Sequence, residues 1–269
     1  MKFKTIKIKA EEFLLAFTTR NNDIKLNYCI ENNAGDSFNK DFIKDFFNKS
    51  VAKYTFGNNE HYIFCGSILS RTNKNSIIIG AGLISETRTF GEFKKFVGCR
   101  GQLTLDRVNK KYPNTQATFL GDPGLMVREI FDVDIEKKYS VGIIPHFVDY
   151  EKVMSMVGDN PNFHIIDIKR NYKDVCKDIL MCDIILSSSL HGLIFSDGLS
   201  VKNNWVKFSD KIIGGDFKFN DYYSVMDRAK KEPIVCNSLD DINYALTNSF
   251  VSHNPNYGKM LNTISEYFK

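Results

Sequence analysis

The strongest candidate for a catalytic or binding motif is Ser-Ser-Ser-Leu-His-Gly at residues 187–192, in which a histidine lies among serines and a glycine. It follows an apolar run, 182–186, and begins a segment with helical periodicity, so it reads as a strand-to-helix joint. In open α/β sheets ligands bind beyond the carboxyl ends of the strands, where helix N-termini favour anions. An imidazole there can bind phosphate or exchange a proton near neutral pH. The hexapeptide alone leaves two interpretations open: His191 contacts a substrate, or it caps the helix and satisfies a buried carbonyl.

A second joint of the same kind lies in the first half of the chain, in the stretch VGCRGQLT at residues 97–104. A strand ends just before Arg100, Gly101 makes the turn, and a helix follows. The arginine side chain offers a rigid fork of donors for a carboxylate or a phosphate. Taken alone, this motif favours a solvated arginine in a loop over a ligand contact.

Three further strand ends supply candidates for the lining of a cleft. Gly35 and Asp36 precede a helix predicted over 37–48 with Ser37 as its N-cap, and a glycine loop of this kind allows a substrate to approach closely. Asp122 lies in Gly-Asp-Pro-Gly, a turn sequence that favours a tight loop. His146 follows the predicted strand 140–145, where either a cleft position or a packed loop is open.

Several signatures of bound cofactors and metals are missing from the sequence. It contains no complete GxGxxG fingerprint, no P-loop and no HExxH motif, and no group of His, Asp and Glu at metal-ligand spacing. The six cysteines form no CxxC pair, and most lie in apolar runs. We therefore expect neither a nicotinamide cofactor nor a metal site, and we expect reduced cysteines.

Short apolar runs alternate with helical segments along the chain, which is typical of an α/β fold with a largely parallel sheet. A charged stretch at 133–138 interrupts this pattern, and a new strand–helix series starts after it. We predict two Rossmann-like domains, residues 1–135 and 136–269, the first contributing Arg100 and the second His191. Whether the last helix, predicted over 257–268, packs back on the first domain is left open. The predicted elements are strands at 24–30, 61–69, 76–81, 95–99, 118–120, 140–145, 164–168, 183–187 and 204–208, and helices at 37–48, 101–111, 150–157, 172–181, 190–199, 239–248 and 257–268.

The charge balance favours a small anionic substrate over nucleic acid. The net charge is +4, with lysine and arginine spread along the chain instead of gathered into a stripe. The same balance permits weak attraction to an acidic membrane surface. The apolar run 13–17 is too short for a signal-peptide core, and the longest apolar run elsewhere, 76–84, is far shorter than a membrane span. These features predict a cytoplasmic protein, with peripheral contact at the inner face of the membrane as an option.

The order of the motifs resembles that of the polysaccharide pyruvyl transferase family from about residue 30 to about residue 228. The most specific blocks are R-G-x-L-T at 100–104, G-D-P at 121–123 and S-x-L-H-G at 188–192. The other blocks of the series are Asn33-Ala34-Gly35-Asp36, Cys65-Gly66-Ser67, Gly80-Ala81-Gly82 and Gly142-Ile143-Ile144-Pro145-His146.

The resemblance implies a fold like that of GT-B glycosyltransferases, with two Rossmann-like domains facing a cleft. It implies transfer of pyruvate from phosphoenolpyruvate onto two hydroxyls of a sugar in a cell-surface polysaccharide or its lipid-linked precursor. The products would be a cyclic ketal and free phosphate, with phosphoenolpyruvate as donor substrate and no cofactor.

The resemblance also implies roles for individual residues. Arg100 would bind the anionic groups of the donor, and Leu190 and His191 would contact it, with His191 as the acid or base. Ser188, Ser189, Gly192 and Lys218 complete the expected donor side, and Gly35, Asp36, Asp122 and His146 the acceptor side or cleft. Many members carry arginine where this chain has Ser189, and the candidates for supplying that charge are Arg71, Arg88, Lys207 and Lys218.

Two alternatives remain at this stage. A GT-B glycosyltransferase would use the same His-Gly joint to hold a nucleotide sugar, because a fold does not determine a function. A non-catalytic sugar-binding relative is the other alternative, and Ser189 favours it.

Overall fold

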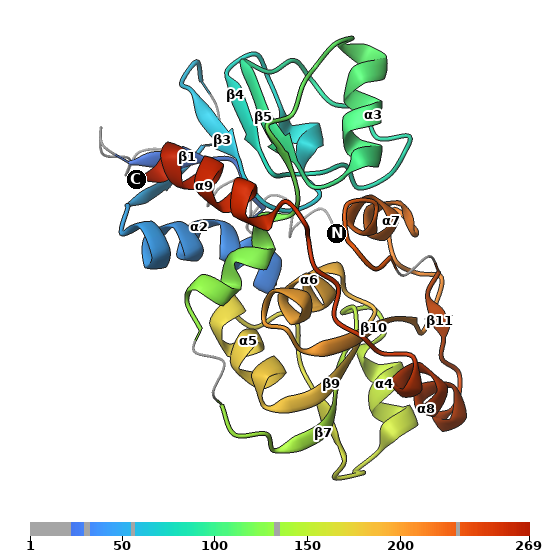
Figure 1. Ribbon diagram of the computed structural model, residues 1–269. Coiled ribbons are helices and arrows are strands. Elements are labelled where there is room, and N and C mark those ends of the chain that lie inside the picture. Colours follow the sequence, from blue (N-terminus) through green and yellow to red (C-terminus); the bar gives the residue numbers. More distant parts are fainter. Residues whose placement is uncertain (1–22, 30–32, 55–56, 132–134, 230–231) are drawn as a thin grey trace, which may run out of the picture.

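Two parallel sheets, one after the other along the chain, form the framework of the protein (Figure 1). The structure is a computed structural model that describes residues 23–269 except 30–32, 55–56, 132–134 and 230–231. The apolar run 13–17 therefore lies outside the described residues, as does part of the charged stretch predicted as a linker. None of the described helices is long and apolar enough to cross a membrane.

The first sheet holds, within the described residues, six strands in the order β2-β1-β3-β4-β5-β6, and every neighbouring pair is parallel. Its helices are α2 (Ala34–Phe47) and α3 (Gln102–Lys111), with two 3-10 helices, η1 (Leu69–Arg71) and η2 (Pro123–Glu129). The strands are β1 (Ile24–Leu26), β2 (Val51–Lys53), β3 (His61–Ile63), β4 (Ser76–Ile79), β5 (Lys95–Cys99) and β6 (Phe119–Leu120).

The second sheet holds five described strands in the order β11-β10-β9-β7-β8, again all parallel. The strands are β7 (Tyr139–Ile144), β8 (Phe163–Ile165), β9 (Cys182–Ser187), β10 (Lys202–Lys207) and β11 (Ile234–Val235). The helices are α4 (Tyr150–Val157), α5 (Tyr172–Leu180), α6 (Leu190–Gly198), α7 (Phe217–Tyr223), α8 (Leu239–Thr247) and α9 (Tyr257–Phe268). The mixed α/β class with parallel sheets, predicted from the alternation of elements, is therefore confirmed.

The start of α2 differs from the prediction. The helix begins at Ala34, and the side chain of Asn33, not that of Ser37, accepts a hydrogen bond from the backbone N–H of Asp36 at 3.0 Å. The Ser37 hydroxyl instead donates to the carbonyl of Ala34 and accepts from the backbone N–H of Tyr172. Ser37 therefore lies within the first turn and links α2 to α5.

Aromatic side chains join the two sheets into a continuous core. Phe38 of α2 lies 5.5 Å from Tyr172 of α5 and 5.7 Å from Phe195 of α6, measured between ring centroids. At the other end, Phe268 of α9 lies 5.0 Å from Tyr62 of β3 in the first sheet, measured between ring centroids. The chain thus returns from the second sheet to the first, as the course of α9 in Figure 1 shows. Burying large aromatic rings in this way stabilises the contact between the halves.

Candidate active site

The loops at the carboxyl ends of both sheets bring His191 into a small cluster of polar side chains. His191 is the second residue of α6, which lies between the sheets (Figure 1). Its Nε2 lies 3.6 Å from the sulfur of Cys65, which follows β3. The sulfur of Cys65 in turn lies 3.3 Å from an oxygen of Asp122, which follows β6. Two loops far apart in sequence therefore meet at the imidazole near the start of α6.

Gly35 provides the space for the imidazole ring of His191. A Cβ atom on Gly35 would lie 2.1 Å from two atoms of that ring, far inside van der Waals contact. Gly35 sits in the first turn of α2, so the helix N-terminus approaches His191 closely. The sequence predicted that a substrate approaches Gly35 closely, whereas in the structure the space beside Gly35 holds the ring of His191.

Asp122 is fully buried, and the two oxygens of its carboxylate differ in their hydrogen bonding. Its Oδ1 caps η2 by accepting the N–H of Gly124 at 2.9 Å. Its Oδ2 has no hydrogen-bond partner among the described residues. A buried carboxylate oxygen without a partner is costly, so its retention points to a ligand or to a role in the chemistry.

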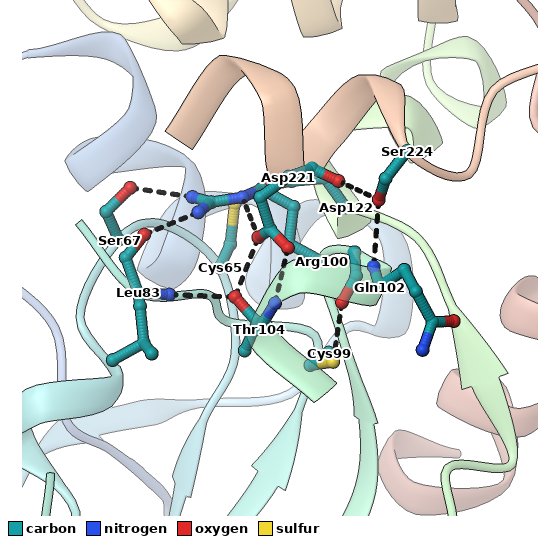
Figure 2. A network of polar contacts seen from close by, with 11 residues as sticks. Cys65, Ser67, Leu83, Cys99, Arg100, Gln102, Thr104, Asp122, Asp221 and Ser224 are labelled. Atoms are coloured by element: carbon teal, nitrogen blue, oxygen red, sulfur yellow. Dashed lines mark hydrogen bonds and ion pairs between the residues drawn. The ribbon is translucent and has the colours of Figure 1, made fainter. Parts of the chain in front are cut away.

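Arg100 joins the two halves of the molecule and is itself fully buried (Figure 2). Its Nε donates to Asp221 of α7 at 2.8 Å, and its other nitrogens donate to the hydroxyl of Ser67 at 2.6 Å and the carbonyl of Leu83 at 2.5 Å. Asp221 also accepts from the backbone N–H and the hydroxyl of Thr104, both at 2.7 Å. The guanidinium therefore anchors α7 to the first sheet.

Lys218 lies on α7 three residues before Asp221 and faces the same region. Burial and the charge of Arg100 lower the pKa of Lys218 to about 8. Lys218 makes no hydrogen bond or ion pair with the residues that the structure describes, and its ammonium lies 5.3 Å from the ring of Phe219. An unpaired, largely desolvated ammonium is a natural partner for an anionic ligand.

The other three residues that could replace the arginine expected at Ser189 either have partners elsewhere or are exposed to solvent. Arg71 donates to the carbonyl of Tyr28 at 3.1 Å, and Lys207 pairs with Asp210 at 2.7 Å. Arg88 is exposed. Of the four candidates, Lys218 is the one whose charge acts on the histidine cluster.

The two histidines of the site have lowered pKa values. Burial is the largest cause for His191, and Arg100 and Lys218 lower its pKa further, while the carboxylate of Asp122 opposes them. Burial and Lys218 lower the pKa of His146 to about 4, with Asp149 opposing. Both imidazoles are therefore neutral at pH 7, in a region of positive potential.

The serines before His191 shape the joint between β9 and α6. The hydroxyl of Ser188 accepts the backbone N–H of His146 at 2.8 Å and so ties the two strand ends together. Ser189 is the N-cap residue of α6, but its side chain makes no capping hydrogen bond. Leu190 is buried, and Gly192 packs where a Cβ would lie 2.3 Å from the hydroxyl of Ser187.

The structure thus gathers most of the residues predicted for the site, in several different roles. Gly35 and Asp122 surround His191 directly, and Lys218 acts on both His191 and His146 through its charge. Asp36 pairs with the side chain of Asn33 at the start of α2, which is a capping role. Cys65 was predicted as a core cysteine and counted in the Cys-Gly-Ser block, but its place in the site was missed. The predicted strand 61–69 includes Cys65, whereas β3 ends at Ile63, so the glycine at position 66 was the available signal of an earlier strand end.

The fold and this cluster define an α/β protein with a candidate site at the carboxyl ends of its parallel strands. The sequence model of the polysaccharide pyruvyl transferase family matches residues 17–209, and the chain belongs to that family. The membership identifies the chain as a transferase and places it in polysaccharide biosynthesis, with pyruvyl transfer as the class of reaction.

Two individual proteins are similar to the chain. The uncharacterized protein L143 of Acanthamoeba polyphaga mimivirus is 33% identical over 221 residues, which cover 78% of this chain and 77% of the relative. The crystal structure of the functionally uncharacterized protein KP1_0663 from Klebsiella pneumoniae has a TM-score of 0.46 and 15% identity, covering 86% of this chain and 99% of the other.

Proposed function

We propose that the protein transfers pyruvate from phosphoenolpyruvate onto two hydroxyls of a sugar, forming a cyclic ketal and releasing phosphate. The proposed site lies between two Rossmann-like domains, residues 1–135 and 136–269, in a GT-B-like arrangement. The acceptor is a cell-surface glycan or its lipid-linked precursor, met in the cytoplasm at the inner face of the membrane. The observation that carries the proposal is a neutral, half-buried His191 beside an unpaired Lys218 in a chain of this family.

The first step adds an acceptor hydroxyl across the double bond of the donor. The neutral imidazole of His191 takes the hydroxyl proton while the oxygen bonds to C2 of phosphoenolpyruvate. The imidazolium delivers that proton to the methylene carbon in the same step, so that C2 takes on oxocarbenium character, no carbanion forms, and the methylene becomes a methyl group. In the second step the neighbouring hydroxyl attacks C2, the bond to phosphate breaks, the proton of this hydroxyl leaves with the phosphate, and the ring closes.

The donor carries a carboxylate and a phosphate, and the site offers it positive potential. Lys218 supplies an unpaired charge, and the start of α6, which has no side-chain cap, adds free N–H groups. Arg100 serves as a positioning residue that holds α7, and hence Lys218, while its buried charge adds to the potential. The direct donor contact predicted for Arg100 is thereby replaced, in this proposal, by one from Lys218.

In this proposal a groove of about 580 Å³ between α3 and α7 provides space for the acceptor. The loop residues 85–87, which begin two residues after Leu83, also line it. Arg107 lines it, and the Nε of that arginine is buried without a partner among the described residues. Hydroxyls of Ser85 and Thr87 face the same space, which suits the polar edge of a sugar.

The decisive experiment incubates the protein with phosphoenolpyruvate and a panel of hexoside acceptors. The expected result is acceptor-dependent phosphate release together with the mass increase of a pyruvate ketal. No mass increase with any acceptor, combined with thermal stabilisation by a nucleotide sugar, would contradict the proposal and favour a glycosyltransferase. Binding of sugars without turnover would favour the non-catalytic alternative.

Replacing Lys218 with alanine should raise KM for phosphoenolpyruvate by about 10- to 100-fold, because a charge-assisted contact contributes about 1.5–3 kcal/mol. The matched control is Lys211→Ala, an exposed lysine seven residues earlier. Initial rates of phosphate release over a range of donor concentrations measure the effect. Equal KM values for the two variants would assign the donor charge elsewhere.

The rate should show a bell-shaped dependence on pH. It falls on the acid side as His191 becomes protonated below its lowered pKa, because imidazolium cannot accept the hydroxyl proton. On the alkaline side it falls above about pH 8, where Lys218 loses its charge. A profile of kcat/KM in wild type and Lys218→Arg checks this: arginine keeps its charge, so the alkaline limb should move to higher pH.

Replacing Gly35 with alanine should lower kcat by about 10-fold or more, because the new methyl group forces the ring of His191 out of its place. The control is Gly258→Ala, a position with open space around its Cβ. Steady-state rates and the NMR signal of the His191 ring measure the effect. An unchanged ring environment in Gly35→Ala would show that the two groups are not in contact.

A further inference from the structure

Three side chains at the site form a set of ligands that suits a borderline-soft metal ion. One atom from each of Cys65, Asp122 and His191 lies within 4.8 Å of the other two. Thiolate, imidazole and carboxylate are the protein ligands of Zn²⁺. The three residues follow β3, follow β6 and begin α6, so the fold itself brings them together and their sequence spacing gives no hint of it.

The distances between the ligand atoms fit one tetrahedral ion. Bond lengths of about 2.3 Å to sulfur and about 2.0–2.2 Å to nitrogen or oxygen put ligand atoms roughly 3.5 Å apart. In the structure the sulfur of Cys65 lies 3.6 Å from Nε2 of His191 and 3.3 Å from Oδ1 of Asp122. The third pair, Asp122 and His191, lies within 4.8 Å, so a small movement brings the three atoms onto one ion.

A second, independent observation points to a cation. Asp122 is fully buried, and its Oδ2 has no hydrogen-bond partner among the described residues. Buried polar atoms are nearly always satisfied, and a carboxylate oxygen is satisfied by a donor or by a metal. Of the other two ligands, Cys65 is buried and His191 is partly buried.

We propose that Cys65, Asp122 and His191 bind one Zn²⁺ ion and that this ion switches the enzyme off. Binding replaces the S–H bond of Cys65 with a sulfur–zinc bond, and the thiol proton leaves to solvent. Water fills the fourth position, as in zinc sites with three protein ligands. The inhibitory half of the proposal rests on the proposed function, because the metal occupies the Nε2 atom that His191 needs for proton transfer.

The site should discriminate between metals. Mg²⁺ and Ca²⁺ prefer all-oxygen ligands and larger coordination numbers, so they should neither bind here nor inhibit. Co²⁺ should bind like Zn²⁺, and its thiolate charge-transfer absorption reports the bond to sulfur. Because the thiol loses its proton on binding, affinity should rise with pH.

The binding test titrates Zn²⁺ against a chromophoric chelator in the presence of the full chain, and repeats the titration with Co²⁺ followed by absorption. We expect one equivalent per chain and, for Cys65→Ala, at least about 100-fold weaker binding with no thiolate absorption. The control is Cys99→Ala, another buried cysteine at the end of a strand, whose sulfur contacts the carbonyl of Gly101. Absence of binding by wild type, or equal binding by Cys65→Ala, would overturn the proposal. Cys65→Ser, which preserves the side-chain shape, is read in the same way if the alanine variant does not fold.

The inhibition test keeps this proposal separate from the proposed function. Zn²⁺ should reduce turnover of wild type and Cys99→Ala reversibly, with recovery on adding a chelator. Metal binding with no turnover under any condition would overturn the proposed function and leave the metal site standing. Turnover that stays the same with one bound equivalent of Zn²⁺ would overturn the inhibitory role alone.

Discussion

Replacing His191 with glutamine should lower kcat by about 10²–10⁴-fold, the usual contribution of a positioned acid–base group. Glutamine keeps a polar side chain of similar length but cannot take up a proton at neutral pH. The donor should still bind, because its charges meet Lys218 and the N-terminus of α6 and not the imidazole. KM for phosphoenolpyruvate should therefore change by much less than kcat.

The matched control for this variant is His253→Gln, an exposed histidine remote in sequence from the site. Its phosphate-release rate and its thermal unfolding midpoint should equal those of wild type. A His191→Gln protein that folds and turns over within a few-fold of wild type would remove the imidazole from the mechanism. Loss of activity with a collapsed unfolding midpoint would instead show that His191 has a structural role.

The sequence predicted most of the secondary-structure elements that carry the motifs, but it missed several short elements between them. The alternation of apolar and helical segments predicted the parallel class, and β5 and α9 lie where they were predicted. The strands β2 and β11 were missed, because the first includes the charged Lys53 and the second is only Ile234–Val235, so neither forms a clear apolar run. Helix α7 was missed as well, since its aromatic residues suggested packing without a helical repeat.

Contacts between residues far apart in the sequence are the part of the site that the sequence alone could not predict. Arg100 was expected to meet a ligand, but its partner in the structure is Asp221, 121 residues further along the chain. No local sequence pattern predicts such a pair, because the pairing depends on how the two sheets pack against each other. The same holds for Cys65 and His191, which are 126 residues apart. The motifs locate the strand ends, and only the packing of the halves shows which ends meet.

Removing the carboxylate of Asp221 should destabilise the protein by about 3–5 kcal/mol, because it leaves the buried Arg100 charge without its partner. Asp221→Ala also removes the acceptor for the N–H and hydroxyl of Thr104. Urea unfolding at pH 7 measures the change in the free energy of unfolding. The control is Glu60→Ala, which breaks the exposed pair with Lys94 and should cost about 1 kcal/mol or less.

A double replacement separates stability from activity at this ion pair. Arg100→Met with Asp221→Leu exchanges two buried charges for apolar side chains and should regain much of the stability that Asp221→Ala loses. It should not regain turnover, since the buried positive charge is gone and the ion pair no longer holds α7 with Lys218 in place. The KM for phosphoenolpyruvate should rise in the double variant even where its unfolding midpoint approaches that of wild type. Recovery of both properties would mean that Arg100 is a structural clamp with no part in donor binding. Recovery of neither would mean that the hydrogen bonds of Arg100 to Ser67 and Leu83 are as necessary to the fold as the ion pair itself.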